Sequence, residues 1–583
     1  MNTKIFGMAA LCLLLSQYCL SQDKQTLPDT AHYIINDSVL IRTKDGATLS
    51  AVVVRKKGVV EKLPTAMMFF IYSNLERSLM EAKYSADHGY AGMVADTRGK
   101  RLSPDTIEPY EHEARDVNSV IDWIVQQPWS DGRVGMYGGS YSGFAQWAAA
   151  KYLHPALKTI VPYVAAIPGQ GLPMENNVFL TANYQWAFYI TDNKYTDDAV
   201  DNDNDRWRRM RLNWWDAGAA YNKIDSVDGT PNPWLQKWLS HPDYDGYWQS
   251  MVPYKEDFSK INIPVLTITG YYDDGQISAL EYLREHYRYN PKAEHYLIIG
   301  PYDHFGAQRG GVANLRGYEV DPVALINTRE ITFQWLDHIL RSGPKPALLK
   351  DKINFEVMGA NTWKHVPSMD KMESSTLRLY LCKGGDQTLR GWKDHSLRSI
   401  KPANEEFIGQ TVDLADRTTF NNDYYPDPII KKEIDRTNGV FFISEPFDKP
   451  VSISGVLQGV LKAIINKKDM DIGVVLYELT PKGEYFQLSY FLGRASYAQD
   501  RTKRHLLTPG KLETIPFIRS RVFSKQLSKG SRLVMVLNID KNPFAQINYG
   551  TGKDVSVETV KDAGAPLEIR WSTESWLEIG ISR

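Results

Sequence analysis

The chain has 583 residues, of which 43% are hydrophobic and 23% charged, and its formal net charge is -1. This composition is typical of a globular protein, and the length exceeds what one hydrophobic core organises, so we expect two or three domains. The near-zero net charge gives no electrostatic reason to expect a nucleic-acid partner or an anionic membrane surface.

The first 22 residues have the pattern of a secretory signal peptide. Lys4 supplies the positive charge, residues 5–15 form an apolar segment too short to span a bilayer, and cleavage is expected after Ser21. We therefore expect export to the periplasm or the cell exterior, without a transmembrane anchor. The mature chain keeps one cysteine, Cys382, which we interpret as a buried apolar side chain in a strand.

Residues 23–165 and 260–350 alternate between strand patterns and helix patterns. Such alternation predicts a doubly wound parallel sheet of the α/β class, whose chemistry lies at the carboxyl ends of the strands. The strands are expected at 33–42, 48–56, 66–72, 90–96, 133–137, 159–164, 264–270 and 295–301, and the helices at 115–127, from 141 onward, at 277–287 and at 330–341.

Between the two halves of this sheet the alternation stops, and residues 166–259 have the pattern of an inserted helical cap that is rich in tryptophan. Residues 201–205 resemble the start of a calcium-binding loop, but Arg206 stands at its glycine position and Leu212 at its glutamate position. We therefore interpret this run as a solvated acidic turn and expect no metal.

Residues 351–583 lose helical periodicity and show short alternating stretches separated by turn signals. This pattern predicts an all-β sandwich or jelly-roll domain at the C-terminal end. The stretches lie at 377–381, 451–456, 473–479 and 533–539.

The stretch 134–144 carries the strongest chemical signal, because a short strand runs into Ser140 between glycines and a helix follows. This is the arrangement of a nucleophile elbow, in which side chains at Gly138 or Gly143 would collide with the adjoining strand and helix. The second glycine follows the serine by three residues instead of the usual two. A glycine-rich corner without chemistry and a phosphate-binding loop are the alternatives, although no lysine follows Gly143 as a P-loop requires.

A serine hydroxyl needs a base within hydrogen-bonding reach, and the base needs a carboxylate to orient it. Asp273 and His304 each follow a predicted buried strand and come after Ser140 in the order Ser, Asp, His. Because the carboxyl ends of parallel strands meet at one edge of the sheet, these three residues predict a catalytic triad.

Several stretches resemble the CocE/NonD family of α/β-hydrolases, the group of cocaine esterases, X-Pro dipeptidyl-peptidases and α-amino acid ester hydrolases. The family motif G-x-S-Y-x-G matches 138–143 and accounts for the displaced glycine. Further matches are D-x-R-G-x-x-x-S at 96–103, the approach to the elbow strand at 128–132, G-W-Y-D at 270–273 and G-P-W-x-H at 300–304, the last two with tyrosine for tryptophan. The resemblance implies a hydrolase domain, a helical cap and a C-terminal jelly roll.

The resemblance also implies an oxyanion hole formed by the backbone N–H of Tyr141 and the hydroxyl of Tyr72. Asp274 competes with Asp273 for the role of the triad acid, and the family motif favours Asp273. Asp274 is then a candidate ligand for a substrate amine. In the α-amino acid ester hydrolases, carboxylates that bind the amine follow the catalytic acid by two and three residues, where this chain has Gly275 and Gln276.

We therefore expect an exported serine hydrolase that cleaves ester or amide bonds of a small-molecule or short-peptide acyl substrate, without a cofactor. The expected acyl substrates include those with a free α-amine and X-Pro dipeptides. The alternatives are an inactive hydrolase fold whose jelly roll binds a glycan or other ligand, and a metal-dependent hydrolase that uses residues 201–205. The natural substrate and homo-oligomer formation stay open.

Overall fold

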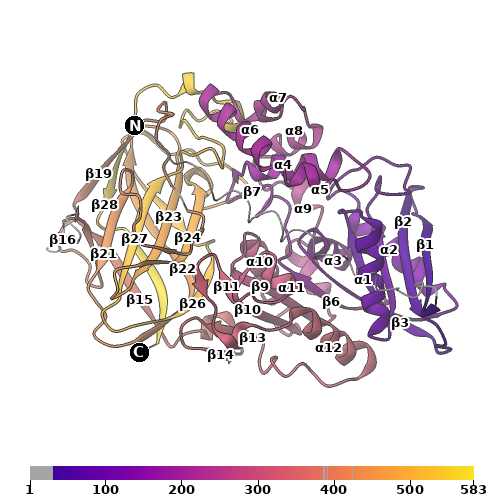
Figure 1. The fold of residues 1–583 in the computed structure, drawn as a ribbon. Helices are drawn as coiled ribbons and strands as arrows, with labels where there is room; N and C mark the ends of the chain where they lie inside the picture. Colours follow the sequence, from indigo (N-terminus) through magenta and orange to yellow (C-terminus); the bar gives the residue numbers. More distant parts are fainter. Residues whose placement is uncertain (1–30, 385–387, 390–391, 423, 583) are drawn as a thin grey trace, which may run out of the picture.

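The computed structural model describes residues 31–384, 388–389, 392–422 and 424–582. The predicted signal peptide, residues 1–22, lies outside the described residues. Figure 1 shows an α/β part, a helical part above it, and an all-β part beside both, drawn in orange to yellow. The fold class predicted from the sequence is confirmed.

The α/β part is built on a sheet of ten strands in the order β1-β2-β4-β3-β5-β6-β9-β10-β13-β14. The strands from β4 to β13 in this order run parallel, whereas β1, β2 and β14 pair in antiparallel fashion at the two ends. Their bounds are β1 Tyr33–Arg42, β2 Thr48–Lys56, β3 Leu63–Phe70, β4 Ala91–Asp96, β5 Ser130–Gly139, β6 Leu157–Tyr163, β9 Val265–Tyr272, β10 His295–Asp303, β13 Ile353–Val357 and β14 Thr362–Val366.

Helices α1 (Leu75–Asp87), α2 (Glu113–Val125), α3 (Tyr141–Lys151), α10 (Gln276–Tyr289) and α12 (Thr328–Arg341) pack on this sheet. Four of them lie where the periodicity predicts a helix, but α1 was not predicted. Its buried face consists of small residues, so large apolar side chains do not mark a stripe. The helix lies directly on β4, because a Cβ on Gly92 would meet the Ala82 carbonyl oxygen at 2.0 Å.

The cap consists of α4 (Ala182–Thr191), α5 (Asp198–Asp201), α6 (Asn204–Ala217), α7 (Ile224–Asp228), α8 (Pro233–Leu239) and α9 (Gly246–Gln249). Its tryptophans are largely core residues, and Trp207, Trp215, Trp238 and Trp248 are fully buried. Among the described residues, no helix combines the length and apolar character that crossing a membrane requires.

The C-terminal part is a sheet system of thirteen strands, in which the long strand β22 pairs with four others. The bounds are β15 Ser375–Cys382, β18 His395–Arg398, β19 Phe407–Val412, β20 Ile430–Lys431, β21 Val440–Ser444, β22 Val451–Ile465, β23 Asp471–Leu479, β24 Tyr485–Arg494, β25 Leu512–Phe517, β26 Val522–Leu527, β27 Arg532–Ile539, β28 Leu567–Ser572 and β29 Trp576–Ser582. Cys382 is a free, buried cysteine.

The structure differs from the expected boundary between residues 350 and 351. Strands β13 and β14 follow that boundary, yet they complete the first sheet, because Ile353–Val357 runs parallel to β10 and then pairs with Thr362–Val366. A fully buried strand and an edge strand look alike in sequence to the short strands of an all-β domain. The all-β sheet itself begins with β15 at Ser375.

Buried polar contacts join the all-β part to the cap segment, residues 166–259, and to the hydrolase part. Arg521 makes two 2.8 Å bonds to the carboxylate of Glu175, and both side chains are at most 4% exposed. Gln276, at the start of α10, bonds through both amide atoms to the backbone of Val522 in β26, at 2.7 and 3.0 Å. The domain interface therefore reaches the end of β9, where Asp273 was predicted to act.

Candidate active site

Ser140 lies at the turn between β5 and α3 with φ 58° and ψ -118°, a conformation that is strained for a residue with a side chain. Its N–H donates to the Tyr163 carbonyl at 3.0 Å. Gly138 has φ 131°, which glycine adopts most readily. A Cβ on Gly143 would lie 2.8 Å from both Ala165 Cα and the Tyr163 carbonyl, so the displaced glycine lets α3 pack against the end of β6.

Asp273 and His304 are hydrogen-bonded to each other, with 2.8 Å between His304 Nδ1 and Asp273 Oδ1. The carboxylate of Asp273 is buried and also accepts hydrogen bonds from the Thr269 hydroxyl at 2.7 Å and from the Gly275 N–H at 2.9 Å. The aspartate is thus held by β9 and by the turn that follows it. This geometry orients the imidazole with Nε2 as its second, free nitrogen.

The nucleophile elbow and the turn that carries His304 lie against each other. A Cβ on Gly139 would meet the Gln308 side chain at 2.2 Å, and Gln308 Nε2 donates to the His304 carbonyl at 2.8 Å. Within the described residues the Ser140 hydroxyl makes no hydrogen bond to His304.

The Tyr72 hydroxyl follows β3 and interacts with the side chain of Ser140. It also accepts a 3.0 Å hydrogen bond from the indole N–H of Trp186 in α4. Burial raises the pKa of Tyr72, so its hydroxyl keeps its proton at neutral pH. Because the indole uses a lone pair of the Tyr72 oxygen, the phenolic proton is left to point toward the site of Ser140.

Tyr141 is the first residue of α3, a position whose backbone N–H has no partner within the helix. Its side chain turns away from the site, donates to the carboxylate of Glu113 and accepts a 3.0 Å bond from the N–H of Tyr110. Burial raises the pKa of Glu113 to about 8. Tyr110 stacks on Tyr141 and on Trp186, with ring centroids 5.1 and 5.4 Å apart, so aromatic rings join the elbow to the cap.

Asp274, the second acid of the predicted motif, makes no hydrogen bond to the His304 imidazole among the described residues, and its side chain is solvent-exposed. In the described part of the chain it makes no ion pair, although its backbone carbonyl accepts a 3.4 Å bond from Arg521. By contrast, the neighbouring Asp303 lies 3.7 Å from Arg316. Asp274 is therefore an unpaired carboxylate beside the predicted triad.

Other residues singled out in the sequence have local roles in the fold. Asp203 caps α6 through a 2.9 Å bond from the Arg206 N–H, and the residues described contain no group of side chains that could hold a metal ion. In the D-x-R-G stretch, Arg98 bonds to Asp116 at 2.6 and 2.7 Å, and the Ser103 hydroxyl accepts from the Gly99 N–H at 2.9 Å. These contacts shape the loop after β4.

Sequence reasoning missed Trp186, Thr269 and Gln308. Thr269 lies in β9, four residues before Asp273, and a hydroxyl at this spacing before a candidate acid was the available signal. Trp186 lies in a cap with many tryptophans and without a motif, so its contact with Tyr72 has no sequence signal.

Comparison with known proteins agrees with this architecture. A family model described as X-Pro dipeptidyl-peptidase (S15 family) matches residues 45–306, which include all three predicted triad residues. A second model, described as the X-Pro dipeptidyl-peptidase C-terminal non-catalytic domain, matches residues 350–562. The chain belongs to the CocE/NonD family of serine hydrolases. The resemblance seen in the motifs is thereby confirmed.

Relatives within this family carry different names. Cocaine esterase of Rhodococcus sp. (strain MB1 Bresler) is 23% identical over 569 residues, which cover 91% of this chain and 95% of that protein. An aminopeptidase from a marine sediment archaeon (Thaumarchaeota archaeon) is 20% identical with a TM-score of 0.77, and the match covers 94% of this chain and 96% of that one. An α-amino acid ester hydrolase is 20% identical with a TM-score of 0.76, and the match covers 97% and 100%. These structures show a shared fold.

The pKa of His304 provides a test of the contact with Asp273. Burial alone would lower this pKa, but the hydrogen bond and the negative charge of Asp273 raise it above the ordinary value. We expect NMR titration of ring-labelled histidine, assigned with a His304→Gln variant, to show an elevated pKa that falls in Asp273→Asn. Asp274→Asn removes only a more distant charge and should lower the pKa less. An equal or larger fall in Asp274→Asn would contradict the assignment of Asp273.

Proposed function

We propose that this member of the family hydrolyses esters or amides through Ser140, His304 and Asp273. The observation that carries the proposal is the 2.8 Å bond between His304 and a buried Asp273 at the same sheet edge as the strained Ser140. The strained turn supports a nucleophile presented above the sheet, and the bonded pair supports an oriented base. The matched family model spans the same three residues.

In this mechanism Ser140 Oγ attacks the carbonyl carbon while Nε2 of His304 accepts the serine proton. Asp273 holds the imidazole and stabilises the imidazolium that forms. The C–O or C–N bond of the tetrahedral intermediate then breaks, and His304 protonates the leaving alcohol or amine. Water hydrolyses the acyl-enzyme by the same steps, which releases the acid and restores Ser140. Because the base must be neutral, turnover should decline as the pH falls through the raised pKa of His304.

The developing oxyanion would be bound by the N–H of Tyr141 and by the Tyr72 hydroxyl. Support for Tyr72 comes from its interaction with Ser140 and from the Trp186 N–H, which occupies the acceptor side of the hydroxyl. A donor fixed in this way before the reaction needs no reorganisation in the transition state. Trp186 is then a positioning residue that acts through Tyr72.

Export and the range of acyl groups stay predictions. The signal-peptide pattern in residues 1–22 supports export. For the acyl group, the unpaired carboxylate of Asp274 beside His304 favours substrates with a free α-amine. The amine site would rest on this single carboxylate, because Gly275 and Gln276 serve the fold: the first bonds to Asp273 and the second to β26.

Replacement of Ser140 by Ala tests the nucleophile. We expect kcat for a simple ester to fall by about 10⁶, because the acyl-enzyme cannot form, while the melting temperature stays close to wild type. Fluorophosphonate labelling of the intact protein should modify Ser140 and should be lost in the variant. Ser142→Ala is the matched control, since it removes a neighbouring hydroxyl of the same helix turn. Turnover retained in Ser140→Ala would refute the proposal and favour an inactive fold or another nucleophile.

Replacement of Tyr72 by Phe tests the oxyanion donor. We expect kcat to fall by about 10²–10³ with little change in KM, because the hydroxyl stabilises charge that develops only in the transition state. Trp186→Phe keeps an aromatic ring but removes the indole N–H, and it should lower kcat less than Tyr72→Phe does. In a Tyr72→Phe background the Trp186 substitution should have no further effect on kcat. Additive losses would show that the two residues act separately.

The role of Asp274 is tested with phenylglycine methyl ester and its N-acetyl derivative. We expect kcat/KM to favour the free amine by about tenfold to a hundredfold, the size of a charge-assisted hydrogen bond. Asp274→Asn should remove this preference and leave turnover of the N-acetyl ester unchanged. Equal turnover of both esters by the wild-type enzyme would exclude an amine site and indicate a general carboxylesterase.

A further inference from the structure

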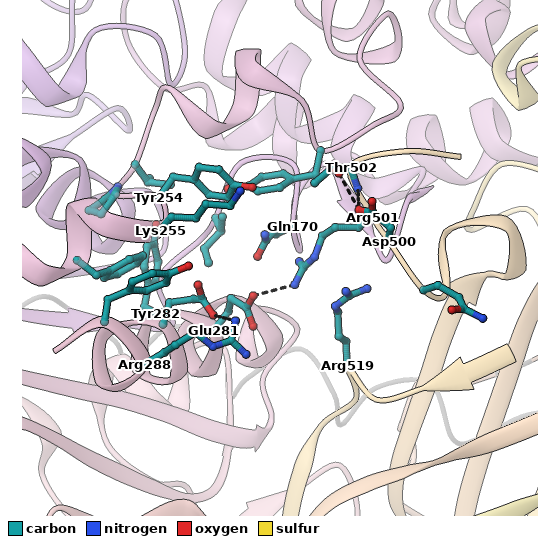
Figure 2. A pocket seen from close by; sticks show the side chains of 18 residues that line it. Gln170, Tyr254, Lys255, Glu281, Tyr282, Arg288, Asp500, Arg501, Thr502 and Arg519 are labelled. Carbon is teal, nitrogen blue, oxygen red and sulfur yellow. Dashed lines mark hydrogen bonds and ion pairs between the residues drawn. The ribbon is translucent and has the colours of Figure 1, made fainter. Parts of the chain in front are cut away.

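A cavity of about 210 Å³ lies where the cap, helix α10 and the all-β domain meet, and we call it the junction pocket. It is lined by Gln170, Tyr254, Tyr282 and Arg519, among other residues, and by none of the three predicted triad residues. Figure 2 shows Arg501 and Arg519, from loops of the all-β domain, facing the same open space as Gln170. The pocket is thus separate from the candidate active site.

The charges along the pocket are not balanced one for one. Glu281 pairs with Arg501 at 2.7 Å, and Glu285 pairs with Arg288 at 2.6 Å. Arg519 lines the same space, yet its guanidinium makes no hydrogen bond or ion pair with any residue that the structure describes. Burial, together with repulsion from Arg501, lowers the pKa of Arg519 to about 10. A partly desolvated guanidinium without a partner is costly, and an anion beside it would offset that cost.

The net charge of the pocket lining favours a bound anion with a single negative charge. Lys255 lies at the pocket with an exposed side chain, and Asp500 lines it while its carboxylate accepts bonds from the N–H and hydroxyl of Thr502. Four cationic side chains therefore face three carboxylates, an excess of one positive charge. A carboxylate matches this excess, whereas a phosphate dianion would be repelled by the three acids.

Two further features of the pocket indicate which other groups a ligand would carry. Gln170 is 8% exposed, and its Oε1 has no hydrogen-bond partner among the described residues, so it can accept a bond from a ligand N–H or O–H. The rings of Tyr244, Tyr254, Phe258 and Tyr282 line the pocket and supply an apolar surface. The volume lies below the range of about 300–1,000 Å³ found for drug-sized ligands, so the ligand is small.

We propose that the junction pocket binds a small organic carboxylate that carries an apolar group and a hydroxyl or amide beside the carboxylate. Arg519 binds the carboxylate through its forked N–H groups, the neighbouring donor bonds to Gln170, and the apolar group packs on Tyr254 and Tyr282. This site does not depend on the proposed catalytic mechanism, because it uses no residue of the triad or the oxyanion hole.

Mandelate is the probe, because it combines a carboxylate, an adjacent hydroxyl and a phenyl ring. Binding is measured by isothermal titration calorimetry to the full chain with Ser140→Ala, so that no turnover occurs. We expect Arg519→Gln to raise the Kd by about tenfold or more and Arg519→Lys to have a smaller effect. Mandelamide, which lacks the charge, should bind at least tenfold more weakly than mandelate by the same reasoning. Arg208→Gln, at an exposed arginine of α6, should leave the Kd unchanged.

The hydroxyl contact is tested with phenylacetate, which lacks only that group. It should bind more weakly than mandelate to the parent protein, and Gln170→Leu should abolish the difference. A mandelate Kd that Arg519→Gln does not change, equal binding of mandelamide, or no binding of mandelate would overturn the proposal. Ester turnover and melting temperature of Arg519→Gln with Ser140 intact show whether that variant is folded.

Discussion

The backbone turn at Ser140 is the constraint on which the rest of the site depends. A residue with a side chain is held at φ 58°, and the hydrogen bond from its N–H to the Tyr163 carbonyl ties the turn to the neighbouring strand. Such a conformation persists only where the surroundings determine it fully. Here the close approach of Gly143 to Ala165 seats α3 on the end of β6, which leaves the serine projecting above the sheet. The strain is therefore maintained by packing that any bulkier residue at 143 would disrupt.

The candidate site is assembled from three parts of the chain that are distant in sequence. The sheet supplies Ser140, Asp273 and His304, the cap supplies Trp186 behind Tyr72, and the all-β domain supplies Arg521 behind Asp274. Arg521 is held in turn by the buried carboxylate of Glu175, so the position of the loop after β9 depends on an ion pair across the domain interface. Removing one partner of a buried ion pair strongly destabilises a protein. The all-β domain therefore supports the loop beside the predicted triad although it contributes no triad residue.

The predicted triad rests on local signals in the sequence, whereas contacts between distant segments have no such signal. Ser140, Asp273 and His304 each follow a buried strand. The carboxyl ends of parallel strands lie at the same edge of the sheet, independently of the conformation of the loops. Trp186 reaches Tyr72 across 114 positions of sequence, and no periodicity encodes that contact. Helix α1 has no sequence signal, because its buried residues are serines and alanines. Strand β13 lies beyond residue 350 and yet joins the first sheet, and its five buried residues have no amphipathic pattern that would indicate this. The spacing of apolar residues in a sequence indicates that one face of an element is buried, but it does not indicate which other element packs on that face.

Contacts through Ala166 link the junction pocket to the nucleophile elbow. Tyr282, whose ring lines the pocket, donates to the Ala166 carbonyl at 2.9 Å, and the Ala166 N–H contacts the Ser140 carbonyl at 3.4 Å. The ring of Tyr282 also stacks on Trp147 of α3, with centroids 4.6 Å apart. A shift of Tyr282 would therefore reach the strained turn through two hydrogen bonds and one ring contact. Because close-packed interiors transmit displacement, these contacts place the strained turn within reach of movements in the pocket wall.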